Sequence, residues 1–192
     1  MHSQEYIDIY ENEAQDQARD IMNSLNLFKI SHKVRIEYIL NKVKELSVKN
    51  VIDVGCGWGV ITRAIDHLGG VRVIGVDISP TKVCFCSSFF SAFCLDATIL
   101  DKFQNLGHQN LKRGFDMVIC GELIEHVDTP KELVQVCHHL ADKYVIWTAP
   151  AGLHKRVYST DSLIKEVENK DFESSYTKLD NWHIVCQKRM EN

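Results

Sequence analysis

The sequence predicts a doubly wound α/β fold, and two patterns lead to that expectation. Short apolar runs alternate with segments whose apolar residues recur at helical spacing, as in parallel strands joined by crossover helices. The first run, 51–54, is followed by glycines at alternate positions, Gly55, Gly57 and Gly59, and then by a helical segment. A strand, a tight glycine turn and a helix, in that order, predict the site of a nucleotide-like cofactor.

The remaining elements follow from the same two periodicities. A short helix and a polar connection are expected within 98–114, and two short helices within 1–28. We expect further helices over 31–46, 60–68, 80–88, 130–141 and 160–167. We expect further strands over 71–77, 89–95, 115–120 and 144–148, and a terminal antiparallel hairpin over 174–179 and 183–188. The whole chain, 1–192, then forms a single domain, in which residues 1–48 serve as an N-terminal helical lid.

Length and composition fit one globular domain. Its 192 residues are 45% hydrophobic and 25% charged, and the net charge of -4 gives no strong attraction to a polyanion. The sequence contains no apolar run of bilayer length, and the first residues lack the pattern of a signal peptide. The seven cysteines are odd in number and include no C-x-x-C pair. We therefore expect a reducing, cytoplasmic compartment, and the sequence carries no signal for an oligomeric state.

Carboxylates at successive strand ends indicate how the cofactor is held. Asp53 precedes the first glycine by two residues, and Asp77 ends the second strand. An acid at that distance from the glycine turn meets the ribose hydroxyls in doubly wound folds. Asp77 could instead cap the next helix, but Ser79 fills that role better. Asp96 ends the third strand, where it can accept a hydrogen bond from an adenine amine.

The glycine spacing indicates which cofactor this is. The dinucleotide fingerprint G-x-G-x-x-G would place its third glycine at Val60, which disfavours a nicotinamide oxidoreductase. The segment 53–59, D-V-G-C-G-W-G, instead resembles the first motif of class I S-adenosylmethionine (SAM) methyltransferases. This resemblance covers about residues 35–192. It implies a Rossmann-like, seven-stranded, mostly parallel sheet with helices on both faces and an antiparallel hairpin at its C-terminal end. It implies SAM as the cofactor, with contacts from Asp53, Gly55, Cys56, Gly57, Asp77, Ile78, Asp96, Ala97 and Cys120.

A second motif, E-L-I-E-H, follows the fourth strand, where this fold places the methyl acceptor. Glu122, Glu125 and His126 stand at i, i+3 and i+4, so on a helical turn they would share one face. Two carboxylates and an imidazole on one side can hold a divalent cation. Alternatively, His126 pairs with one glutamate and acts as a metal-free general base. His154, after the fifth strand, can face His126 because the two strand ends are neighbours in this topology.

The set Glu122, Glu125, His126 and His154 resembles the metal site of small-RNA 3′-end 2′-O-methyltransferases. Its E-x-x-E-H part is also similar to the O-methyltransferases of ubiquinone biosynthesis. The resemblance implies that these four residues are catalytic and bind Mg²⁺ or Mn²⁺, which would activate an acceptor oxygen. The sequence lacks extended basic clusters, which favours a small-molecule acceptor over RNA. We expect SAM-dependent methyl transfer to an oxygen of a small molecule. A 3′-terminal RNA ribose 2′-O-methyltransferase and a non-catalytic methyltransferase-like partner subunit are the alternatives.

The helix over 31–46 carries a basic face in addition to its apolar one. Lys33, Arg35, Lys42 and Lys44 lie on that face. A run of basic residues on a helix is usually solvated, and we expect that here. Contact with an acidic substrate is the alternative.

Overall fold

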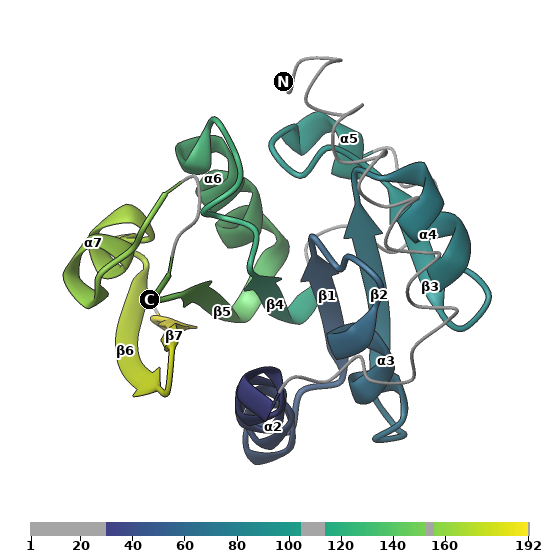
Figure 1. Ribbon diagram of the computed structural model, residues 1–192, viewed down its shortest axis with the longest axis horizontal. Coiled ribbons are helices and arrows are strands. Elements are labelled where there is room, and N and C mark those ends of the chain that lie inside the picture. The colour runs from purple at the N-terminus through teal and green to yellow at the C-terminus, as the bar shows by residue number, and fades with distance from the viewer. Residues whose placement is uncertain (1–29, 105–113, 153–155, 192) are drawn as a thin grey trace.

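The computed structural model describes residues 30–104, 114–152 and 156–191, and these residues form a seven-stranded sheet (Figure 1). The strand order is β3-β2-β1-β4-β5-β7-β6. Strands β1 to β5 are parallel, and β7 runs antiparallel to both β5 and β6. The strand order reverses between β1 and β4, and doubly wound sheets bind ligands at the carboxyl ends of the strands at such a point. The expected fold class is confirmed.

The observed elements match the expected ones closely. The helices are α2 (Ile30–Glu45), α3 (Val60–Asp66), α4 (Pro80–Cys86), α5 (Leu100–Gln104), α6 (Pro130–Leu140) and α7 (Thr160–Glu166). The strands are β1 (Asn50–Val54), β2 (Arg72–Asp77), β3 (Ser91–Cys94), β4 (Phe115–Gly121), β5 (Ala141–Pro150), β6 (Phe172–Leu179) and β7 (Trp182–Arg189). In the described ranges no helix has both the length and the apolar character that a membrane crossing requires. The helices expected within 1–28 lie outside the described residues.

Two strands differ in length from the expectation. β3 begins at Ser91 because the backbone N–H groups of Phe89 and Phe90 donate to the carbonyl of Cys86 and close the end of α4. β5 is longer than expected because it pairs with β7 as far as Pro150. The longer β5 brings the start of β7, at Trp182, to the carboxyl edge of the sheet.

Apolar residues on both faces of the central strands form two core layers. On one face, Val51 of β1 and Ile119 of β4 pack with Ile39 of α2 and residues of α3. On the other face, Ile52 and Val118 pack with residues of α6 and α7. Figure 1 shows these helices on opposite sides of the sheet. Because the strands are covered on both faces, ligands can reach them only at the strand ends and the loops there.

A polar network fixes the second core layer beneath β5 and β7. The side-chain oxygen of Gln187 accepts a hydrogen bond from Nε1 of Trp147 at 2.7 Å and lies 2.8 Å from Nε2 of His138. Since an amide oxygen only accepts, His138 carries its proton on Nε2, and Nδ1 accepts from Asn169 at 3.2 Å. Burial lowers the pKa of His138, so the neutral ring is the form that suits this site.

We expect His138 to weaken the folded state under mildly acidic conditions. Its pKa is lower in the folded protein than the unfolded reference of about 6.5, so the unfolded state binds more protons below that pH. The stabilisation from the neutral ring is complete above the unfolded pKa and is lost as pH falls towards the folded one. The His138→Gln variant should therefore lose less unfolding free energy than the parent between pH 7.5 and 5, measured by urea denaturation.

The exposed neighbour His139 provides a matched control. The His139→Gln variant should keep the pH dependence of the parent. Equal pH slopes in the parent and in His138→Gln would contradict this account.

Candidate active site

The turn after β1 places three glycines in the left-handed region of backbone space. Gly55, Gly57 and Gly59 have φ values of 75°, 55° and 74°, which side chains with a Cβ adopt only with strain. The N–H groups of Gly55 and Cys56 donate to the carbonyl of Val76 at 2.8 and 2.9 Å. These bonds tie the turn to β2, and α3 begins directly after it.

The three glycines differ in what surrounds them. A Cβ on Gly59 would collide with Phe90 and Cys86, and one on Gly55 would lie 2.7 Å from Leu123. A Cβ on Gly57 would meet no atom within 4 Å. Gly59 and Gly55 therefore allow close packing of the protein itself, whereas Gly57 keeps space open beside the turn.

Asp77 joins the glycine turn to the end of β2. One carboxylate oxygen accepts the N–H of Gly57 at 2.9 Å, and the other accepts the N–H of Ser79 at 2.9 Å. The Ser79 hydroxyl accepts the N–H of Lys82 at 3.2 Å, so Ser79 caps α4 as expected. Each Asp77 oxygen retains a second lone pair, which can accept a hydrogen bond from a hydroxyl group.

The next strand end carries the other predicted cofactor residues. One carboxylate oxygen of Asp96 accepts from both the N–H and the hydroxyl of Thr98, at 2.9 and 2.6 Å. Asp96 and Ala97 are half-buried just beyond β3, and Ile78 is half-buried just beyond β2, the neighbouring strand. Cys120 is fully buried at the end of β4. The sheet therefore brings these residues to one edge, as the sequence predicts.

Asp53 is a buried carboxylate directly before the turn. Its side chain accepts a hydrogen bond from the Thr62 hydroxyl at 2.6 Å, and only 2% of the residue is exposed. Burial raises its pKa to about 6, while that hydrogen bond and the Arg35 charge act in the opposite direction. Whether Asp53 is ionised thus depends on the balance between its burial, which favours the neutral form, and the nearby Thr62 and Arg35, which favour the charged form.

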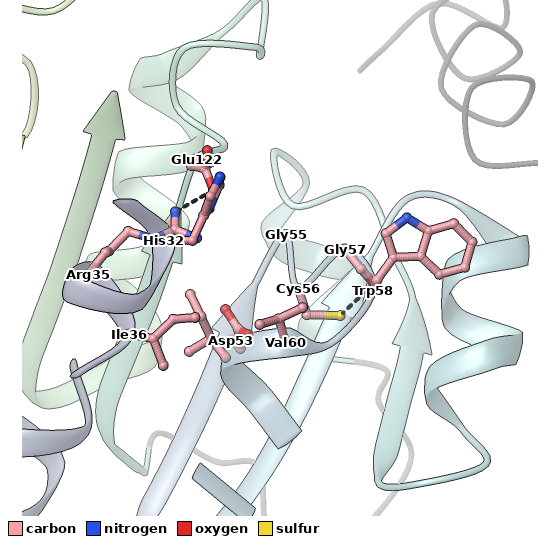
Figure 2. Close-up of a pocket in the computed structure, with 12 residues that line it drawn as sticks. His32, Arg35, Ile36, Asp53, Gly55, Cys56, Gly57, Trp58, Val60 and Glu122 are labelled. Atoms are coloured by element: carbon pink, nitrogen blue, oxygen red, sulfur yellow. Dashed lines mark hydrogen bonds and ion pairs between the residues drawn. The ribbon is translucent and has the colours of Figure 1, made fainter. Parts of the chain in front are cut away.

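A cavity of about 250 Å³ lies between the glycine turn and the start of α2 (Figure 2). Glu122 and Gly121 line it from the end of β4. The predicted cofactor residues that line it are Asp53, Gly55, Cys56 and Gly57, and the α2 residues are His32, Arg35 and Ile36. The other predicted cofactor residues lie along the neighbouring strand ends.

Arg35 is the charged centre of this cavity wall. Its side chain forms an ion pair of 2.5 Å with Glu122, and its guanidinium lies 4.3 Å from the centre of the Trp182 ring. Its Nη1 lies 3.4 Å from the Thr148 hydroxyl, whereas its buried Nε has no hydrogen-bond partner among the described residues. Within the described part of the chain, the guanidinium therefore has one donor that no acceptor fills.

The expectation of a solvated basic face is wrong for Arg35, which is only 5% exposed. Arg35, Ile39 and Val43 recur every four residues and lie on the same buried face of α2. Lys33 and Lys44 are exposed, as expected. The four-residue spacing is the signal in the sequence that could have indicated the burial of Arg35.

Two further residues beside Arg35 were not predicted as site residues: His32, which lines the cavity, and Trp182, which packs against Arg35. Nδ1 of His32 lies 3.6 Å from the Glu122 carboxylate, and the His32 ring lies 5.3 Å from the Trp182 ring. Figure 2 shows His32 and Glu122 side by side. Trp182 comes from β7, which is distant in sequence, and no local pattern marks it as part of the site.

The E-L-I-E-H segment does not form the single helical turn that its spacing suggests. Glu122 has a left-handed φ of 54°, and its N–H donates to the carbonyl of Thr148. A turn forms only after Glu122, where the N–H of His126 donates to the carbonyl of Leu123 at 2.9 Å. The expectation that Glu122 shares a helical face with Glu125 and His126 is therefore wrong, because the left-handed residue turns the backbone between them.

Glu125 and His126 belong to this turn, and their side chains form a pair that does not include Glu122. Glu125 is fully buried, and neither of its carboxylate oxygens has a hydrogen-bond partner in the described parts of the chain. Nε2 of His126 lies 4.0 Å from the nearer oxygen. Burial raises the pKa of Glu125 to about 8, so its neutral form persists at neutral pH.

The four predicted metal ligands are not brought together in the part of the chain that the structure describes. Within it, no group of three His, Cys, Asp or Glu side chains is placed to hold a metal ion. Glu122 faces Arg35, and His154 lies outside the described residues. The metal site stays a prediction.

Comparison with known proteins identifies the domain. Residues 52–143 match a family described as a methyltransferase domain, and this segment runs from β1 through the E-L-I-E-H motif to β5. Residues 52–143 are thus similar to methyltransferase domains. The sequence-based assignment to this class is confirmed.

The chain matches curated relatives of greater length. It is 34% identical over 112 residues to a ubiquinone biosynthesis O-methyltransferase of Actinobacillus pleuropneumoniae serotype 7 (strain AP76), covering 56% of this chain and 47% of that protein. It is 29% identical over 146 residues to the mitochondrial ubiquinone biosynthesis O-methyltransferase of Dictyostelium discoideum, covering 62% and 44%. The chain therefore spans about half the length of the curated relatives it matches.

Solved structures share the fold at low sequence identity. Magnesium protoporphyrin IX methyltransferase from Synechocystis PCC 6803 with bound S-adenosylhomocysteine (SAH) superposes with a TM-score of 0.73 at 17% identity. That match covers 96% of this chain and 97% of the other. The methyltransferase domain of the bacterial protein CtHen1 superposes with a TM-score of 0.68 at 16% identity, covering 82% and 99%. These likenesses establish the fold.

We expect substitutions at Gly57 and Gly59 in the glycine turn to affect ligand binding and folding stability separately. The Gly57→Ala variant places a methyl group in the open space beside the turn, so it should weaken SAH binding by about tenfold or more. The Gly59→Ala variant collides with Phe90, so it should mainly lower thermal stability. Calorimetric titration with SAH and thermal unfolding measure the two effects.

Gly70→Ala controls for backbone strain, because Gly70 has a similar φ of 68° and an added methyl group there would meet no atom within 4 Å. Gly70→Ala and Gly57→Ala should lose similar stability, and only Gly57→Ala should lose SAH affinity. Equal SAH affinity in both variants would remove Gly57 from the binding site.

Proposed function

We propose that this domain transfers a methyl group from SAM to an oxygen of a small-molecule acceptor. The observation that carries the proposal is the cavity between the glycine turn and α2. Its wall contains a buried guanidinium, and one donor of that group has no acceptor among the residues that the structure describes. The family match and the names of the curated relatives support the reaction class.

The cavity wall suits the amino-acid end of SAM. That end carries a carboxylate, and a planar guanidinium binds a carboxylate through two parallel hydrogen bonds. Arg35 lines the cavity and has an unpartnered Nε among the described residues, so it is our candidate for that contact. Asp53 lines the same cavity and can attract the ammonium group when it is ionised.

The strand ends beside the cavity suit the adenosine end. Asp77 retains acceptor capacity for the ribose hydroxyls, and Asp96 lies one strand further along the same edge. A cofactor bound across β1, β2 and β3 would therefore meet the turn, Asp77 and Asp96 in that order.

The bound cofactor supplies a methyl group already activated by a positively charged sulfur. The protein has to align the acceptor oxygen and accept its proton. Glu122 lines the cavity just after β4, and His126 lies four residues further along the chain. Both are our candidates for the acceptor side. We propose that the accepting atom is an oxygen, and the O-methyltransferase names of the relatives support this choice.

A divalent cation is expected to bind on the acceptor side. Carboxylate and imidazole donors suit Mg²⁺ or Mn²⁺, and a cation bound to them would polarise an acceptor hydroxyl. Neither Glu125 oxygen has a hydrogen-bond partner in the described ranges, which supports this assignment because a cation would satisfy both. Glu122, Glu125, His126 and His154 are the proposed ligands.

We expect Arg35 and Asp77 to recognise different ends of the cofactor. The Arg35→Met variant should lose about tenfold or more in SAH affinity, because it removes a charge-assisted pair. It should bind 5′-methylthioadenosine, which lacks the amino-acid end, as the parent does. The Asp77→Asn variant should bind both ligands more weakly. Calorimetric titration measures all four affinities.

Arg63→Met is the matched control, because Arg63 is exposed and lies over the Phe89 ring outside the cavity. It should bind both ligands as the parent does. An Arg35→Met protein that is folded and binds SAH with parental affinity would refute the role of Arg35.

The acceptor class can be tested with methyl-labelled SAM. We expect transfer to small hydroxyl compounds such as catechols or sugars, and loss of turnover in His126→Ala with SAH affinity preserved. Transfer to short RNA alone would exclude the small-molecule acceptor. Full turnover in excess chelator would exclude the cation and leave His126 as a metal-free base.

A further inference from the structure

Asp53 is a carboxyl group that is buried in the protein and also borders the cavity. Only 2% of the residue is exposed, and it lines the cavity together with Arg35 of α2 (Figure 2). It belongs to β1 and lies one residue before the end of that strand. A ligand in the cavity can therefore reach a carboxyl group that bulk water hardly reaches.

Without a bound cofactor, the surroundings of Asp53 do not fully support its ionised form. Burial removes the hydration of a carboxylate and raises the pKa of Asp53 to about 6. The nearby Asp77 carboxylate acts in the same direction, whereas the hydrogen bond from Thr62 and the Arg35 charge act against it. Arg35 offsets the charge of Asp53 only in part, because its guanidinium is already paired with Glu122.

The other ionisable groups near Asp53 provide no dedicated cation for it. α3 presents the Thr62 hydroxyl, which carries no charge. Burial raises the pKa of the Cys120 thiol, and a hydrogen bond with Cys86 together with burial raises that of Cys56, so both thiols are neutral. The ionisable residues that line the cavity or interact electrostatically with Asp53 are His32, Arg35, Cys56, Asp77, Cys120 and Glu122.

The amino-acid end of SAM would change this balance of charges. It carries an ammonium group in addition to the carboxylate that we assign to Arg35, and both groups are attached to the same carbon atom. A carboxylate held by Arg35 would therefore bring the ammonium group into the part of the cavity that Asp53 also lines. An opposite charge at short range favours the ionised form of a carboxyl group.

We propose that Asp53 is partly protonated before the cofactor binds, and that the ammonium group of the cofactor expels this proton to the solvent. This inference rests on the proposed function, because it requires the amino-acid end of the cofactor in this cavity. By linkage, cofactor affinity rises with pH over the range in which Asp53 of the free protein loses its proton. Asp53 is thus the residue through which pH controls recognition of the ammonium group.

Calorimetric titration with SAH in two buffers of different ionisation enthalpy measures the protons that binding releases. At pH 6 the parent protein should release about half a proton per SAH, because the pKa of Asp53 is about 6. SAH affinity should rise about tenfold between pH 5 and pH 7, since the ionised fraction of Asp53 rises from roughly one tenth to nine tenths. 5′-Methylthioadenosine has no ammonium group and should release far fewer protons.

Two substitutions test whether Asp53 is the group that loses the proton. Asp53→Asn keeps an oxygen that can accept from Thr62, so it should stay folded by circular dichroism but release no proton. Thr62→Val removes a hydrogen bond that favours the ionised carboxylate, so the proton release at pH 7 should increase. Thr98→Val is the matched control, because it removes a similar hydroxyl from Asp96, and it should keep the proton release of the parent.

Three results would overturn the inference. One is SAH binding at pH 6 without proton release. Another is proton uptake, which would mean that the cofactor carboxylate, not the ammonium group, faces Asp53. The third is parental proton release in either Asp53→Asn or Thr62→Val, which would assign the proton to another group such as His32. Absence of SAH binding at pH 7 would overturn the proposed function as well, whereas SAH binding without proton release would overturn this inference alone.

Discussion

The hydrogen bonds between the glycine turn and β2 are the constraint on which the rest of the site depends. Val76 accepts the N–H groups of Gly55 and Cys56, and Asp77 accepts that of Gly57. These bonds fix the end of β1 against the end of β2 in a conformation that only glycine adopts without strain. This junction between β1 and β2 positions the glycine turn that lines the cavity, the start of α3 and the side chain of Asp77.

Most of the fold could be predicted from the sequence because each element carries its own signal. Buried parallel strands appear as apolar runs, helices as apolar repeats, and strand ends as glycine or aspartate. These signals predict the seven strands and the six described helices in their observed order. The candidate cofactor residues could be located in the sequence for the same reason, since Gly57, Asp77 and Asp96 each lie at or shortly after the end of a strand.

The acceptor side was harder to predict because it depends on contacts between distant segments. The spacing of Glu122, Glu125 and His126 suggests a shared helical face, but the left-handed backbone of Glu122 separates them. The sequence alone places Arg35 in solvent because a charged residue on a helix usually lies there. Its partners are distant in sequence, since Glu122 follows β4 and Trp182 begins β7, and no local sequence pattern indicates these contacts.

The contact between Arg35 and Trp182 has a consequence for how the protein is made. Arg35 lies on the first helix that the structure describes, and Trp182 opens the last strand. A chain emerging from the ribosome at roughly 5–20 residues per second can pair β1 with β2 and β4 well before β7 exists. Until β7 joins the sheet, the guanidinium lacks the indole that covers it. The nascent domain would thus have a formed glycine turn while Arg35 still lacks its contact with Trp182. We therefore expect the cofactor to bind only after the β6–β7 hairpin has been synthesised.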